Sequence, residues 1–475
     1  SRETPPNAPE NPDIPENPDN PAAPASAAPA DGTPPLPPAR EPRLKALVPF
    51  FVFVAFYVGI ACWARDCYAV PMTAAFLVAS ATALLLNRHY KLAEKVEVFA
   101  RGMGDSNIMT MCLIFILSGA FAAVAKHMGA VDAAVLIARH LIPAWGMLAG
   151  VFLVACGISL AIGTSCGTIA ALTPIAIGLV GPMGIPAELL LGAVVGGAMF
   201  GDNLSMISDT TIAATRTQGV EMRDKFLANF RIVVPAAILC VVAYLCLGRS
   251  GAPAPVEPLA LRHLLLVAPY CLILALALLG LNVMALLFFG IVLAAAIGTA
   301  AGSFSGLEAI VYCGKGTLDM AETLIVAILA GGLLAVIRWN GGVSWLLNAI
   351  GRVTRGPRAC EAGVLALVAA INLFTANNTV AIVIAGPIAK RMGDSFHCRP
   401  RRIASLLDTG SCLVQGLIPY GAQILTAIGV ATASGMQVSS LHLVGSMHYQ
   451  FLVALMLVLS IVFQRHPTAA TAAQA

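Results

Sequence analysis

The amino-acid sequence predicts an all-α polytopic membrane protein built from two inverted repeats, with about ten transmembrane helices, two re-entrant hairpins and two broken helices. Of the 475 residues, 58% are hydrophobic and only 11% are charged, whereas soluble domains carry about 25% charged residues. Apolar runs of about 20 residues, long enough to cross a bilayer, recur from residue 44 onward in two nearly equal halves, 44–248 and 262–464. This composition excludes soluble enzymes, nucleic-acid-binding proteins and secreted disulfide-rich proteins.

The apolar runs follow one another along the chain between two tails. Residues 1–43 contain 14 of the 30 prolines and are predicted to be a disordered N-terminal tail, and residues 465–475 form a short C-terminal tail. The predicted apolar spans between these tails are 44–64, 67–86, 106–126, 144–181, 186–226, 228–248, 262–281, 283–300, 319–337, 360–390, 403–435 and 441–464.

Matching residues indicate that the second half repeats the first. Six glycines and valines of the first half recur at a constant offset of 212 residues, which a chance distribution of common residues would not produce in one register. The matched pairs are Gly102 and Gly314, Gly104 and Gly316, Gly119 and Gly331, Val124 and Val336, Gly129 and Gly341, and Val131 and Val343.

Polar residues interrupt four of the apolar runs. The breaks at 163–168 and 375–379 predict re-entrant hairpins with polar tips, and those at 201–205 and 415–419 predict crossing helices that unwind within the membrane. Irregular backbone at this depth is tolerated only where it is buried in protein or lines a cavity.

Charge predicts how the chain is oriented. Five crossings and one hairpin in each half would give the two halves opposite orientations. With the N-terminus inside, 22 of the 28 lysines and arginines fall in inner segments, as the positive-inside rule requires. We therefore expect a multi-pass protein with both termini in the cytoplasm.

Inverted repeats with discontinuous helices are typical of secondary transporters, which bind their substrates near the middle of the membrane. The first break carries two deep carboxylates, Asp202 and Asp209, and an acid at the bilayer centre costs about 2.5–3.5 kcal/mol. These carboxylates are predicted to bind Na⁺ or, in its absence, protons. Helix capping is the alternative role for the polar residues of such a break.

The hairpin tips and one further acid complete the predicted site. Neutral oxygens at the tips are suited to a cation that must bind and then leave. Asp408 is the only other deep acid and is predicted to carry a proton or to pack against a hydroxyl, whereas Glu361 is expected to lie in the interface near a span end. The predicted tip residues are Thr164, Ser165, Asn377, Asn378 and Thr379.

Two motifs resemble the NhaC-type sodium/proton antiporter family of the ion-transporter superfamily: 163–168, Gly-Thr-Ser-Cys-Gly-Thr, and 201–211, Gly-Asp-Asn-Leu-Ser-Met-Ile-Ser-Asp-Thr-Thr. The resemblance covers residues 44–464 in layout, although Cys166 stands where the family often has Trp. It implies Na⁺/H⁺ exchange in a bacterial inner membrane by a dimeric, elevator-like carrier. By position it implies cation-binding roles for Asp202, Asn203, Ser205, Ser208, Asp209 and Thr210.

Parts of the sequence are also compatible with two other functions. The first is a Na⁺-coupled carrier or exchanger of a small organic acid or amino acid; it would need a positive counter-charge, and no basic residue is expected in mid-membrane. The second is an intramembrane aspartyl protease, because 102–105 reads Gly-Met-Gly-Asp, but no Tyr-Asp pair supplies the second aspartate. We therefore expect a transporter rather than an enzyme. The transporter is expected to lie in the lipid bilayer, to need no cofactor besides the transported Na⁺ and H⁺, and to bind no nucleic acid.

Overall fold

The computed structural model describes residues 41–64, 72–87, 90–206, 208–248, 257–278, 281–345, 349 and 356–464. Within these ranges the chain forms helices and turns and no strand, so the predicted class, an all-α polytopic membrane protein, is confirmed. The described residues belong to one compact unit, Ala39–Ala475. The two predicted tails lie outside the described residues, apart from residues 41–43.

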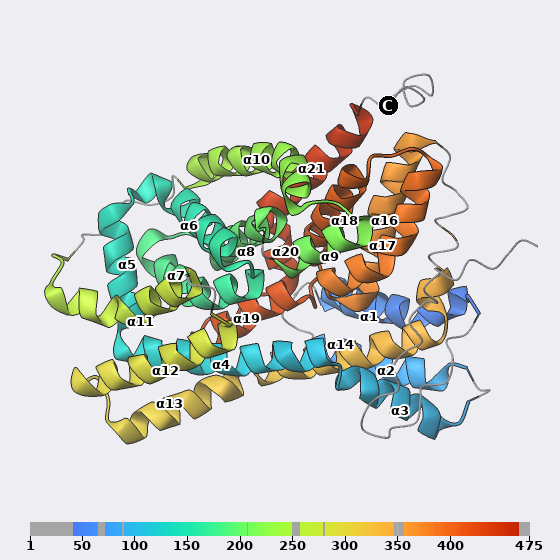
Figure 1. Ribbon diagram of the computed structural model, residues 1–475. Helices are drawn as coiled ribbons and strands as arrows, with labels where there is room; N and C mark the ends of the chain where they lie inside the picture. The colour runs from blue at the N-terminus through green and yellow to red at the C-terminus, as the bar shows by residue number, and fades with distance from the viewer. Residues whose placement is uncertain are drawn as a thin grey trace, which may run out of the picture. The chain divides into compact units, whose positions relative to one another are not determined.

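Ten α-helices and two short 3₁₀ helices make up the described part of the first half (Figure 1). They are η1 (Leu44–Leu47), α1 (Val48–Ala64), α2 (Met72–Leu85), α3 (Leu92–Met103), α4 (Ser106–Met128), α5 (Ala130–Leu141), η2 (Ala144–Gly146), α6 (Met147–Ile162), α7 (Ser165–Met183), α8 (Ala187–Leu204), α9 (Asp209–Gln218) and α10 (Met222–Leu247).

The described part of the second half contains ten α-helices. Its helices are α11 (Leu261–Leu278), α12 (Val283–Ala300), α13 (Gly306–Asp319), α14 (Ala321–Trp339), α16 (Pro357–Thr375), α17 (Asn378–Ser395), α18 (Pro400–Gln415), α19 (Ala422–Ala433), α20 (Ser440–Gly445) and α21 (His448–Val462). Helices α3, α5 and α13 were not among the predicted spans, because each carries charged side chains that interrupt the apolar pattern.

Seven helical segments in the described ranges are long and apolar enough to cross a membrane, or eight if the bent pair α5 and α6 counts as one span. Five of the seven correspond to predicted crossings and two, α7 and α16, belong to the predicted hairpins. The other five predicted crossings correspond to shorter apolar helices, in α1, α2, α11, α19 and α21.

All four predicted interruptions are present. The first hairpin turns at Gly163, whose φ of +76° places it in the left-handed region, where glycine meets no steric penalty. The second hairpin turns at Ala376 with φ of +46°. Helix α8 stops at Leu204 before α9, and α18 stops at Gln415 before α19.

At each break the chain passes from contacts with its own half to contacts with the other half. Helix α8 packs against α6 and α7 of its own half, whereas α9 packs against α17 and α18 of the other. In the same way α19 packs against α7 of the first half. The two hairpins and the two breaks therefore converge on one region of the protein.

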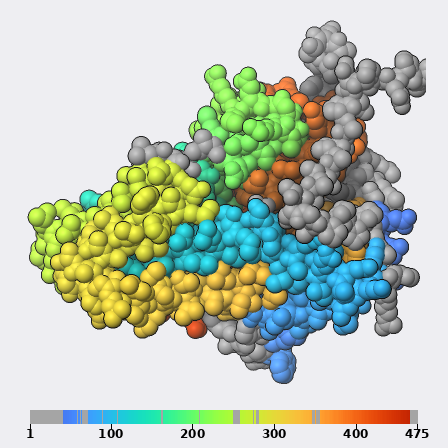
Figure 2. Space-filling view, turned by 60° about the horizontal axis from the view of Figure 1, so that its bottom comes forward, coloured from blue at the N-terminus to red at the C-terminus, as the bar shows by residue number. Residues whose placement is uncertain are grey.

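Two further helix pairs join the halves: α3 packs against α14, and α13 packs against α4. Figure 2 shows one face of this arrangement, on which α4 lies between α12 and α13 while α14 runs beside α3. Four of the matched glycines lie at these contacts: Gly102, Gly119, Gly316 and Gly331. A Cβ atom on Gly119 or on Gly316 would overlap the carbonyl oxygen of the other glycine, and one on Gly102 would lie 2.6 Å from the carbonyl oxygen of Gly331.

Replacement of Gly316 by alanine is expected to lower the free energy of unfolding by about 1–3 kcal/mol, because α13 and α4 would have to move apart to admit the methyl group. Gly314→Ala is the matched control: it lies on the same helix, and nothing within 4 Å would meet its Cβ. The thermal unfolding midpoint of both variants in detergent checks the prediction, and equal midpoints would contradict it.

Candidate ion-binding site

A cavity of about 190 Å³ lies where the two hairpin tips meet the two helix breaks. The first tip contributes residues 163–166, and the second contributes residues 376–379. Asp202, Ser208, Asp209 and Thr210 line it from the first break, and Gln415, Ala422 and Gln423 from the second, with Thr110, Met111 and Ile114 of α4. Segments more than 200 residues apart in the chain thus share one polar chamber.

The two carboxylates of the cavity differ in environment. Asp202 lies in the last turn of α8 with 4% of its surface exposed, and its carboxylate interacts with the side chain and backbone of Ser165 at the first tip. Asp209 is exposed as the first residue of α9. The two acids interact electrostatically. The cavity thus has one buried carboxylate, that of Asp202, and one exposed carboxylate, that of Asp209.

The hydroxyl groups of the first break also hold the break together. The Ser208 hydroxyl accepts a hydrogen bond from the Thr211 amide at 3.3 Å and donates one to the Asp202 carbonyl at 3.2 Å. The Thr211 hydroxyl donates to the Ser205 carbonyl at 2.7 Å. Ser208 is thus the N-cap of α9 as well as a residue of the cavity wall.

Glutamines of the second half connect the two hairpin tips. Gln423 Nε2 donates to the Ser165 hydroxyl at 2.9 Å, and Gln423 Oε1 accepts from Gln415 Nε2 at 2.9 Å. Gln415 Nε2 also donates to the Ala376 carbonyl at the second tip, at 2.9 Å. A continuous chain of hydrogen bonds therefore runs from Ser165 at the first tip through Gln423 and Gln415 to the second tip.

The second tip presents amide and hydroxyl groups. Asn377 caps α17, because its Oδ1 accepts from the Val380 amide at 2.9 Å. Asn378 is 9% exposed, and its Nδ2 lies 3.8 Å from the sulfur of Cys412. Thr379 is half-buried and lines the cavity with both asparagines.

Three predicted site residues do not line the cavity. Asn203 is buried behind it and donates from Nδ2 to the Tyr449 hydroxyl at 3.2 Å. Ser205 is buried at the break, where its carbonyl accepts the Thr211 bond. Asp408 is fully buried in the middle of α18.

Asp408 forms an ion pair with a buried lysine, Lys225, which was predicted to lie in an inner segment of the chain. Lys225 Nζ lies 2.6 Å from Asp408 Oδ2, with 1% and 0% of the two side chains exposed. Asn229 Nδ2 donates to the same oxygen at 2.6 Å. Lys225 is therefore a buried basic residue that was not assigned a role from the sequence, and Asp408 has an ionic partner rather than a hydroxyl.

This ion pair is tied to the first break. Lys225 Nζ also donates to the Asn203 carbonyl at 2.9 Å and to the Thr211 hydroxyl at 2.6 Å. Asn229 Nδ2 donates to the Asn203 carbonyl at 2.7 Å. The Asn203 carbonyl, which has no helical partner because α8 ends there, thus accepts hydrogen bonds from two side chains of α10.

Sequence reasoning missed Gln423, Lys225 and Asn229. Gln415 stood in the predicted break but was not assigned a role there. Lys225 follows Arg223 and Asp224 near the start of α10, where a charge cluster ordinarily indicates a solvated helix end. A helical projection would have put Lys225 and Asn229, four residues apart, on one face.

Glu361 differs from the sequence expectation, and Arg338 lies close to the second tip. Glu361, expected at the interface, is 1% exposed and pairs with Arg402 Nη2 at 2.9 Å. Arg338 lines a smaller cavity of about 70 Å³ with Asp105, and the second tip residue Asn377 lines that cavity as well. Asp105 and Arg338 interact electrostatically.

Comparison with known proteins identifies the family. The model of the Na⁺/H⁺ antiporter family matches residues 43–249 and again residues 258–463. The Na⁺/H⁺ antiporter NhaC of Bacillus subtilis (strain 168) is 25% identical over 404 residues, which is 76% of this chain and 86% of the relative. The malate-2H⁺/Na⁺-lactate antiporter of the same organism is 24% identical over 431 residues, 83% of this chain and 92% of the relative.

A third relative is the arginine/ornithine antiporter ArcD of Halobacterium salinarum, 24% identical over 322 residues, 58% of this chain and 64% of the relative. The two segments matched by the family model together cover most of the sequence. The resemblance seen in the two motifs is confirmed: this multi-pass membrane protein belongs to the Na⁺/H⁺ antiporter family.

Proposed function

We propose that the Na⁺/H⁺ exchange of this secondary active transporter takes place in the cavity between the hairpin tips, with Asp202 and Asp209 as the carboxylates shared by both ions. The observation that supports this most directly is the convergence of both acids with both tips on one chamber. Na⁺ bound to the carboxylates and neighbouring hydroxyls would exclude protons, and protons would exclude Na⁺. Competition for one site, exposed alternately to the two sides, couples the two fluxes.

Electrostatics favours a cation as the cargo. Helices α7, α9, α17 and α19 begin at the cavity, whereas α6, α8, α16 and α18 end there. Each helix end carries about half an elementary charge, positive at the N-terminus and negative at the C-terminus, so these contributions largely offset one another. The charges of Asp202 and Asp209 then make the empty chamber negative.

The roles of individual residues follow from their positions. Asp202, Ser165 and the hydroxyls of Ser208 and Thr210 would form the inner part of the Na⁺ site, and Asp209 would attract the ion at the accessible side. Thr164, Asn377, Asn378 and Thr379 would supply neutral oxygens from the tips. Asn203, Ser205 and Asp408 would support the break from behind, and no cofactor is required.

We also propose that the two halves are inverted repeats, that the protein resides in a bacterial inner membrane with both termini in the cytoplasm, and that cytoplasmic Na⁺ is the ion expelled. The paired hairpins and breaks and the excess of basic residues in the inner segments support this arrangement. A homodimer is proposed by analogy with the superfamily. The protein is proposed to act as a transporter without enzymatic activity.

The test uses purified protein in liposomes that contain a pH-sensitive dye. Na⁺ added outside, with no initial pH gradient, is expected to raise the internal pH because protons leave as Na⁺ enters. Equal concentrations of K⁺ or choline are expected to leave the pH unchanged. The unfolding midpoint verifies that the protein is folded. An unchanged internal pH after addition of Na⁺ to such folded protein would refute the proposal.

A Na⁺-coupled carrier or exchanger of a small organic acid or amino acid is the second candidate. The amides of Asn377, Asn378 and Gln423 line the cavity and could donate hydrogen bonds to a carboxylate, and Arg338 shares a neighbouring cavity with Asn377. Asp105 offsets that positive charge, which leaves the cation site favoured. Labelled malate, lactate or arginine in the same liposomes distinguishes the two: Na⁺-dependent accumulation would support this candidate.

A further inference from the structure

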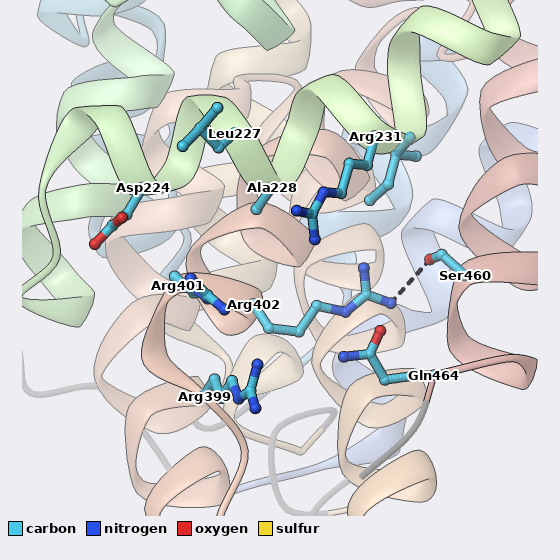
Figure 3. Close-up of a pocket in the computed structure, with 10 residues that line it drawn as sticks. Asp224, Leu227, Ala228, Arg231, Arg399, Arg401, Arg402, Ser460 and Gln464 are labelled. Atoms are coloured by element: carbon cyan, nitrogen blue, oxygen red, sulfur yellow. Dashed lines mark hydrogen bonds between the residues drawn. The ribbon is translucent and has the colours of Figure 1, made fainter.

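A second pocket, of about 210 Å³, lies away from the ion-binding cavity, between the first turns of α10, the start of α18 and the end of α21 (Figure 3). Four arginines line it: Arg231 on α10, and Arg399, Arg401 and Arg402 around the N-terminus of α18. Figure 3 shows the guanidinium groups of Arg231, Arg399 and Arg402 around one space. Asp224 is the acidic residue that lines it.

The four arginines are not equivalent. Arg402 is fixed, because its guanidinium bonds Glu361 Oε2 at 2.9 and 3.1 Å and the Ser460 hydroxyl at 2.8 Å. Arg231, Arg399 and Arg401 are exposed, and within the described part of the chain none of them has an ion pair. With Glu361 and Asp224 counted, the pocket keeps an excess of two positive charges.

The surface that leads away from the pocket is apolar. Helices α10 and α21 pack side by side and expose large apolar side chains along their length. On α10 these run from Leu227, itself a pocket residue and 50% exposed, to Val242, 52% exposed, a distance of roughly 22 Å along a helix. On α21 they are Phe451, Leu455, Val458, Leu459, Val462 and Phe463.

We propose that this pocket binds the headgroup of an anionic phospholipid, with the phosphodiester among Arg231, Arg399 and Arg401 and the acyl chains along α10 and α21. Guanidinium groups bind phosphate oxygens in pairs, and basic pockets between membrane helices on the cytoplasmic side are suited to lipid headgroups. The adjoining apolar surface of two helices matches acyl chains, which inorganic phosphate or a soluble nucleotide would lack.

A lipid in this position would brace the helices that hold the first break. Helix α10 carries Lys225, adjacent to the pocket residue Asp224, and α18 carries both Arg402 and Asp408. A headgroup bound by Arg231, Arg399 and Arg401 would link α10 to the N-terminal end of α18. Bound lipid is therefore expected to stabilise the protein.

The test measures binding of phosphatidylglycerol to the purified protein by native mass spectrometry and by the thermal unfolding midpoint, at constant ionic strength. Phosphatidylglycerol is expected to raise the midpoint by several degrees, whereas phosphatidylcholine and inorganic phosphate at the same concentration are not. Arg399→Gln with Arg401→Gln should weaken phosphatidylglycerol binding roughly thirtyfold, and Arg231→Gln roughly fivefold.

The control is Lys390→Gln with Arg391→Gln, which removes two exposed charges of α17 outside the pocket and should leave lipid binding unchanged. The Arg231→Gln variant, on a different helix, provides a second readout if the double variant folds poorly. Equal loss in the control would show a diffuse charge effect and overturn the proposal. An equal midpoint shift with inorganic phosphate would also overturn it, since the ligand would then be the free anion.

Discussion

Asp202→Asn is expected to abolish Na⁺-dependent proton movement. The asparagine is nearly the same size, so the contact with Ser165 and the packing of α8 should survive, but it can neither neutralise Na⁺ nor take up a proton. Loss of one partner from a buried charged contact costs about 3 kcal/mol or more, which corresponds to roughly a hundredfold loss of Na⁺ affinity. Since both ions are proposed to use this carboxylate, Na⁺ influx and proton efflux should disappear together.

The measurement is the internal pH of liposomes after addition of Na⁺, with the unfolding midpoint as evidence that the variant is folded. Asp394→Asn is the matched control, because Asp394 is an exposed acid at the other end of α17 and does not line the cavity. Exchange retained in a folded Asp202→Asn variant would remove Asp202 from the site. Asp209→Asn, at the accessible side, should raise the Na⁺ concentration for half-maximal exchange by roughly tenfold, about 1.4 kcal/mol.

The positions of the breaks were predictable because they depend on local chemistry. Polar residues inside an apolar run, as in 201–205 or 375–379, cannot remain in lipid, so the chain must bury them around a shared cavity. The convergence of the two tips could be expected for the same reason. The sequence pattern therefore identified nine of the eighteen residues that line the cavity, among them Thr164, Ser165, Asp202 and Asn377.

What a residue type does within a break was not predictable in the same way. Ser208 and Thr210 line the cavity, but Ser205 and Asn203, only a few residues away, turn toward α9, α10 and α21. A hydroxyl or amide can equally well bind a cation or satisfy a freed backbone group. The choice depends on which neighbouring helix supplies a partner, and that is a long-range property of packing.

Lys225 illustrates the other limit of local reasoning. Its neighbours Arg223 and Asp224 indicate a solvated helix end, and only the fold shows that its face of α10 is covered by α18. A lysine with 1% exposure is sustained by Asp408 from the other half of the chain, 183 residues away. The compensation for a buried charge cannot be read from the segment that carries it.

Removal of either member of the Lys225 and Asp408 pair is expected to lower the free energy of unfolding by about 3–5 kcal/mol, because the remaining charge would be left buried without a counter-ion. Lys225→Met and Asp408→Leu preserve most of the volume of each side chain. Their combination, which leaves no buried charge, is expected to be more stable than either single variant, since apolar replacement of a whole buried pair is often neutral.

Unfolding in a denaturing detergent and transport in liposomes check this double-mutant cycle. Lys95→Met is the matched control, because Lys95 is also buried but bonds the Leu84 carbonyl at 2.8 Å rather than an acid; it should cost only about 1–3 kcal/mol. Equal losses of unfolding free energy in all three single variants would show that the ion pair between Lys225 and Asp408 does not stabilise the protein. In the combined variant α8 and α9 lose the Lys225 bonds to Asn203 and Thr211, so exchange should persist with a higher Na⁺ requirement, because the break that positions Asp202 is held less firmly.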